Sequence, residues 1–156
     1  MAIMNLDGID LSILKILQNN AKATIKEMAT ELGMSTTPIF DRIKRLEAQG
    51  VISKYVAIVD PVKLDKKLRV FIEISMADHS GKAINKFVKE ITDHPEVIEC
   101  HHVTGDSDFL IVLQTRDIES YNEFITKKLF KVSNVGKVRS SFSLSIKKQT
   151  TAISLS

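Results

Sequence analysis

The spacing of hydrophobic residues changes once along the chain, and this change limits the folds open to it. Up to about residue 50, apolar residues recur every three or four positions, as on one face of a helix. Residues 68–76 instead alternate apolar and polar, as in a strand with one buried face. The segment 60–67 between them is polar and charged. The pattern predicts a helical domain at 1–59, a linker at 60–67 and an α+β domain at 68–156.

Three helices are expected in the first domain, and the first two have recognisable beginnings. Asp7 and Asp10 have the spacing of an N-cap and the third helical residue, where carboxylates are favoured. Thr24 and Glu27 form a Thr-x-x-Glu capping box for the second helix. Gly33 fits the left-handed position that ends this helix, and a third helix begins almost at once.

The short turn between the second and third helices predicts a helix-turn-helix, a unit that enters the major groove of DNA. The alternative is a three-helix bundle with no nucleic-acid role, because short turns with glycine are common. After the third helix, the β-branched residues of Val51 to Val59 predict a strand. The first domain is therefore a candidate winged helix-turn-helix.

The outward face of the third helix supports DNA binding through hydroxyls and cations. The residues opposite its apolar stripe include Thr37, Lys44 and Arg45, whose side chains can bond phosphates or base edges. Arg42 lies on the flank of this face, and Asp41 is an acid that phosphates would repel. The DNA-binding residues predicted for this domain are Thr24, Ser35, Thr36, Thr37, Arg42, Lys44 and Arg45.

The second domain reads as strand, helix, strand, strand, helix, strand, the ferredoxin-like βαββαβ order. Such a sheet has helices on one face only. Residues 109–113 are apolar on both sides of one strand, so we expect a second copy of the chain to cover the open face. The expected strands are 68–76, 97–104, 109–115 and 138–146, and the helices lie near 84–91 and 118–129.

Composition excludes several classes of protein. The chain has 156 residues and a formal net charge of +3. Its one Cys cannot form a disulfide within the chain, so we expect a reducing, cytoplasmic setting. No apolar run approaches the roughly 20 residues that span a bilayer, so no membrane partner is expected. The first 60 residues carry seven basic and seven acidic side chains. Any nucleic-acid contact must therefore come from a local cluster of charge.

Metal binding and catalysis have little support in the sequence. Cys100, His101 and His102 are adjacent, but on a strand the middle residue points away from the other two. No glycine-rich phosphate loop, nucleophile elbow or paired-carboxylate helix is present. We therefore expect no enzyme activity, no metal and no cofactor.

Three motifs resemble the Lrp/AsnC family of leucine-responsive, or feast/famine, transcriptional regulators. They are LDGIDLSILKILQNNAKAT at 6–24, LGMSTTPIFDRIKRLEAQGVI at 32–52 and ECHHVTGDSDFLI at 99–111. The resemblance implies a winged helix-turn-helix domain that binds double-stranded DNA and an αβ domain that senses an amino acid. It also implies homodimers that assemble further, often into octamers. By position, 35–49 would be the recognition helix.

The turn at 104–108 would belong to the effector pocket, which in this family lies between subunits. A free amino acid carries an ammonium and a carboxylate. Asp106 and Asp108 can hold the ammonium, while backbone N–H groups near Gly105 take the carboxylate. A plain Gly-Asp turn without a ligand is the alternative. The predicted effector residues are Thr104, Gly105, Asp106 and Asp108.

Two other functions remain open for such a chain. Sirohaem decarboxylases of haem biosynthesis resemble the same architecture, and an architectural DNA-binding protein would need no effector. A final expectation concerns residues 150–156, whose apolar side chains predict a strand-like tail at an interface.

Overall fold

The computed structural model describes residues 5–155, which form two compact units. The first unit contains the chain up to residue 58 together with residues from 148 onward, and the second unit spans 59–147. The structure therefore places the end of the chain with the helical unit, whereas the sequence assigned it to the α+β domain. Within the described residues, no helix is long and apolar enough to cross a membrane.

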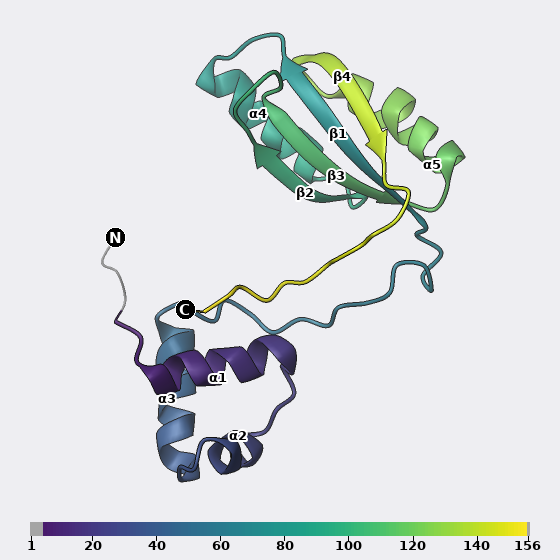
Figure 1. Ribbon diagram of the computed structural model, residues 1–156. Helices are drawn as coiled ribbons and strands as arrows, with labels where there is room; N and C mark the ends of the chain where they lie inside the picture. Colours follow the sequence, from purple (N-terminus) through teal and green to yellow (C-terminus); the bar gives the residue numbers. More distant parts are fainter. Residues whose placement is uncertain (1–4, 156) are drawn as a thin grey trace. The chain divides into compact units, whose positions relative to one another are not determined.

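The first unit is built from three helices, α1 (Gly8–Asn19), α2 (Ile25–Glu31) and α3 (Thr36–Ala48) (Figure 1). The predicted capping box at Thr24 and Glu27 is present, and the predicted N-cap Asp7 forms a second capping box with Asp10. The helices pack through one apolar cluster that includes Ile13, Met28 and Leu46. The predicted helix-turn-helix is confirmed.

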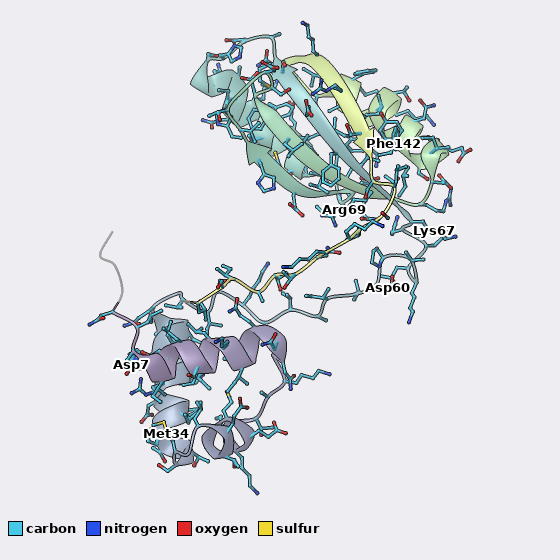
Figure 2. All side chains as sticks on the ribbon, viewed as in Figure 1. Asp7, Met34, Asp60, Lys67, Arg69 and Phe142 are labelled. Carbon is cyan, nitrogen blue, oxygen red and sulfur yellow. The ribbon has the colours of Figure 1, made fainter. Side chains whose placement is uncertain are left out.

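The turn before α3 depends on a glycine. Gly33 has a φ of +64°, a conformation that side chains with a Cβ rarely adopt. The N–H of Met34 then donates to the carbonyl of Ala29 at 2.9 Å, which closes the end of α2. Figure 2 labels Met34 in this turn and Asp7 at the start of α1.

The predicted strand at Val51–Val59 is wrong for the isolated chain. Residues 53–60 have no regular secondary structure and form no ladder with another described segment. Tyr55, Val56 and Ile58 are exposed there, although their β-branched and aromatic character suits a strand. A strand needs a neighbour to receive its backbone hydrogen bonds, and the described chain offers none at this place.

The end of the chain lies on α1 without forming a strand. Gln18 donates from Nε2 to the carbonyl of Ile153 at 3.1 Å and accepts that residue's N–H at 2.6 Å. Leu155 packs against the apolar cluster of the three helices. The tail is therefore fixed by one side-chain amide and one apolar contact.

The second unit is a four-stranded antiparallel sheet in the order β2-β3-β1-β4. The strands are β1 (Leu68–Met76), β2 (Val97–His102), β3 (Phe109–Thr115) and β4 (Val135–Phe142). Helices α4 (Gly81–Thr92) and α5 (Ile118–Glu123) cover one face (Figure 1), and α5 continues into a π-helical turn at Phe124–Lys128. The predicted ferredoxin-like βαββαβ order is confirmed.

Two strands end earlier than the sequence suggested, and β4 also begins three residues before the expected residue 138. β2 ends at His102 instead of residue 104, because the chain turns away from β3 there. β4 starts at Val135 and ends at Phe142, so the alternating residues that follow do not extend it. Leu144 is 99% exposed. The alternation of apolar and polar residues therefore continues in the sequence beyond the end of the sheet, where no surface buries the apolar side chains.

The second face of the sheet carries no helix. The register of β1 and β3 pairs Phe71 with Val112 and Glu73 with Leu110 on this face. Val112 is buried and Phe71 is 36% exposed, while Arg69 and Arg139 form ion pairs with Glu99 and Glu73 around them. The open face is therefore a small apolar centre with a charged border.

Candidate nucleic-acid interface and effector turn

The outer face of α3 is exposed because its inner face supplies the core. Ile39, Ile43 and Leu46 are buried against the other helices. Among the predicted DNA-binding residues, those on the opposite side are exposed, as the helical period requires. These exposed residues are Ser35, Thr36, Thr37, Lys44 and Arg45.

The N-terminus of α3 lacks a side-chain cap. Ser35 occupies the N-cap position with extended backbone angles, but its hydroxyl makes no capping hydrogen bond. The N–H groups at this end carry the positive pole of the helix dipole and are left for an outside acceptor. Thr36 and Thr37 stand beside them, so this helix end suits a phosphate.

Sequence reasoning missed an aromatic residue on the same surface. Phe40 is 45% exposed, and the Lys44 ammonium lies 5.8 Å from its ring centroid. An exposed large aromatic on α3 can contact a thymine methyl group. The signal available in the sequence was the spacing from Lys44, since residues four apart share a helix face.

The two arginines of α3 do not lie free on this face. Arg42 Nη1 bonds Asp7 and Asp10 of α1, at 2.6 Å and 2.8 Å. Arg45 Nη2 bonds both oxygens of Asp10, at 2.7 Å and 2.6 Å. A hydrogen bond from the N–H of Asp10, followed by the Arg42 guanidinium, lowers the pKa of the Asp7 carboxyl. The same two carboxylates raise the pKa of Arg42.

Thr24 and Lys44, two more of the predicted DNA-binding residues, form side-chain hydrogen bonds within the first unit. The hydroxyl of Thr24, a predicted DNA contact, donates to Glu27 Oε2 at 2.9 Å and accepts the Glu27 N–H at 3.2 Å. Lys44 bonds Glu47 at 3.0 Å but stays 61% exposed. Asp41 is exposed, and within residues 5–155 it forms no ion pair.

The turn between β2 and β3 holds its two aspartates in different ways. Asp108 accepts the N–H of Met76 at 2.7 Å and pairs with His79 Nε2 at 3.1 Å. The N–H of Met76 is the main reason why the pKa of the Asp108 carboxyl is lowered. Asp106 is exposed, and its carboxylate receives no hydrogen bond from the described residues, although its carbonyl accepts the hydroxyl of Ser75 at 3.2 Å.

The geometry of this turn leaves polar groups on its surface. Gly105 has a φ of +119°, and both Thr104 and Gly105 are exposed. The ring of His102 stacks on Phe109 with centroids 4.8 Å apart. His79 was not predicted to lie near the turn, because the loop after β1 reaches Asp108 only in the folded sheet. Cys100 and His102 lie on the helix-covered face and His101 on the other, as expected.

Both units match known protein families. Residues 69–153 match the Lrp/AsnC ligand binding domain, and residues 6–53 match a winged helix-turn-helix DNA-binding family. The chain is 36% identical over 153 residues to the glutamate uptake regulatory protein of Zymomonas mobilis, covering 98% of this chain and 93% of that protein. It is 35% identical over 145 residues to the leucine-responsive regulatory protein of Haemophilus influenzae, covering 93% and 87%.

Solved structures agree with these matches over both units. An AsnC family transcriptional regulator from Agrobacterium tumefaciens superposes with a TM-score of 0.91 at 35% identity, covering 96% of this chain and 97% of that one. A transcriptional regulator from Neisseria meningitidis in complex with L-Met gives a TM-score of 0.92 at 30% identity, with the same coverage.

Proposed function

Because the chain belongs to the Lrp/AsnC family of DNA-binding transcriptional regulators, we propose that α3 reads duplex DNA and that the turn at 104–108 binds an amino acid. The observation that carries the first part is the exposed surface of α3 described above. The observation that carries the second is an exposed turn in which the Asp106 carboxylate and the backbone N–H groups of Thr104 and Gly105 have no hydrogen-bond partner among residues 5–155.

On DNA, the uncapped N-terminus of α3 and the hydroxyls of Thr36 and Thr37 bind phosphate or base edges. Lys44 adds a cation, and Phe40 adds an apolar contact on the same side. Thr24 serves the capping box of α2, so its part in binding is to fix the helix that precedes the turn. Arg42 and Arg45 act through their partners on α1.

For the effector, Asp106 is the residue that binds the ammonium group. Asp108 is already held by Met76 and His79, so it shapes the turn around the ligand. Backbone N–H groups at Thr104 and Gly105 are placed to receive the carboxylate. Support comes from the L-Met complex of the Neisseria meningitidis relative. Other relatives are named for glutamate uptake and for leucine, so the proposal is an amino acid as a class.

A second copy of the chain covers the open face of the sheet. The apolar centre at Phe71, Leu110 and Val112 supports this, because its charged border matches the usual anatomy of an interface. A symmetric dimer carries two copies of α3 and so fits a two-fold related DNA site. A pocket at the turn that is completed by further copies would couple ligand binding to assembly up to an octamer.

The test is calorimetry of the protein with each of the twenty amino acids, repeated with Asp106→Asn. We expect at least one amino acid to bind and the variant to bind it at least tenfold more weakly, because one charge is lost at constant shape. Asp93→Asn, which removes an exposed carboxylate at the end of α4, is the control and leaves affinity unchanged. If no amino acid produces heat of binding, the effector part of the proposal is wrong and the protein is a regulator without an amino-acid effector.

The proposal makes the chain a regulator and gives neither unit a catalytic step. A tetrapyrrole decarboxylase on this architecture would use arginines to bind its macrocycle, and Arg116 and Arg139 are each paired with a carboxylate, Asp117 and Glu73. Soret absorbance of the purified protein would contradict the proposal and favour the enzyme.

A further inference from the structure

The start of α1 and the middle of α3 share a closed ionic network. Asp10 donates its N–H to Asp7 Oδ1 at 2.9 Å, and Asp7 donates its N–H to Asp10 Oδ2 at 3.2 Å. The two carboxylates also accept the guanidiniums of Arg42 and Arg45. The network therefore holds two negative and two positive charges and adds no net charge to the surface that meets DNA.

Asp10 is the centre of this network. Its side chain is 1% exposed, whereas Arg42 is 23% and Arg45 48% exposed. A buried carboxylate bonded by two guanidiniums and one backbone N–H is strongly fixed, because charged hydrogen bonds are the stronger class. Each guanidinium gives one nitrogen to this carboxylate, and this fixes the direction in which the rest of the side chain can reach.

We propose that Asp10 is a positioning residue that sets how α3 meets DNA: it withholds Arg45 from the phosphates and, together with Asp7, withholds Arg42. This proposal rests on DNA binding by α3. Arg45 lies next to Lys44 on the exposed side of the helix, where a free guanidinium would bind any phosphate within reach. Phosphate contacts carry no sequence information, so withholding them favours specific over non-specific binding.

The test compares wild type with Asp10→Asn on a selected duplex and on a scrambled duplex, across a range of salt concentrations. Asn keeps the shape of Asp and an acceptor for the Asp7 N–H, but it removes the carboxylate that pairs with Arg45, while Arg42 keeps its ion pair with Asp7. Each new phosphate contact steepens the plot of log K against log salt by about 0.9. We expect this steepening, together with at least a threefold gain on the scrambled duplex at low salt and a lower specificity ratio.

Asp41→Asn is the matched control. It removes one negative charge from the exposed side of α3, and among residues 5–155 its carboxylate forms no ion pair with a member of the network. If Asp10→Asn acted only by changing the net charge, Asp41→Asn would produce the same steepening, and that result would overturn the proposal. The double variant Asp10→Asn with Arg45→Gln should lack the part of the steepening, relative to Asp10→Asn alone, that comes from a new Arg45–phosphate contact.

Arg45→Gln alone keeps the proposal testable if Asp10→Asn does not fold. Because Arg45 is withheld from phosphate, this variant leaves the wild-type salt slope unchanged. A slope flatter by about 0.9 would mean that Arg45 contacts phosphate in the wild type and would overturn the proposal. If wild type itself shows no salt-dependent binding to duplex DNA, the function fails; if wild type binds but Asp10→Asn behaves like Asp41→Asn, only this inference fails.

Discussion

Asp106 and Asp108 are two residues apart in one turn, but the fold gives them different tasks. From the sequence, both were predicted to bind the ammonium group of an amino acid. The structure binds Asp108 to the N–H of Met76, at the end of β1, and to His79, in the loop that follows. Neither contact is local in sequence, so no spacing rule could have separated the two carboxylates.

Asp108 should make stability depend on pH. Its carboxyl pKa is lower in the folded protein than the roughly 3.9 of an unfolded Asp, so its contribution is complete above that value and is lost as pH falls through the folded pKa. We expect Asp108→Asn to lower the urea midpoint at pH 7, with a smaller deficit near pH 3. Asp106→Asn is the control without effect. An equal deficit at both pH values would contradict the assignment.

Phe40 lies on the exposed side of α3 and not in the core. Phe40→Ala should weaken binding to a selected duplex by about 1 kcal/mol through loss of an apolar base contact, with the melting temperature unchanged. Competition binding with duplexes that replace thymine by uracil locates the contact, because uracil lacks the methyl group. A variant that loses stability but keeps its affinity would place Phe40 in a structural role.

At the scale of elements, the sequence predicted most where local chemistry determines the outcome. The capping boxes at Asp7 and Thr24 and the glycine turn at Gly33 begin and end their helices where expected. Elements that depend on distant partners were less predictable. The segment after α3 has strand-forming residues but no strand partner among the described residues, and residues beyond Phe142 alternate without a surface to cover.

The C-terminal tail should stabilise the helical unit. Leu155→Ala should lower the free energy of unfolding by about 1 kcal/mol, less than for a fully buried Leu, because this residue is only partly buried on the core. Gln18→Ala should act in the same direction by removing both bonds to Ile153. Leu144→Ala, at a residue that is 99% exposed, is the control. Chemical denaturation followed by circular dichroism measures all three; equal stability of Leu155→Ala and wild type would mean that the tail is not held.

At the scale of the whole molecule, the chain passes between its two units twice, after residue 58 and before residue 148. The sequence predicted a polar linker at 60–67 for the first passage. It did not indicate the second, because the hydrogen bonds between Gln18 of α1 and Ile153 join residues 135 positions apart.

The proposed dimer depends on the open face of the sheet. Phe71→Glu places a charge in its apolar centre, so we expect the variant to be a monomer at micromolar concentration in light scattering. Phe130→Glu adds the same charge at a residue that is 61% exposed, and it should leave the assembly unchanged. A Phe71→Glu protein of wild-type mass would move the interface to another surface.

Selection of duplexes from a random DNA library, followed by footprinting on the enriched sequence, tests the central claim most directly. A symmetric regulator that reads DNA with α3 should enrich a two-fold related motif, with half-sites about 10–10.5 base pairs apart or a multiple of that distance. Thr37→Ala combined with Lys44→Ala should lose the footprint. No enriched motif, a single protected half-site, or an unchanged footprint with that variant would contradict the account.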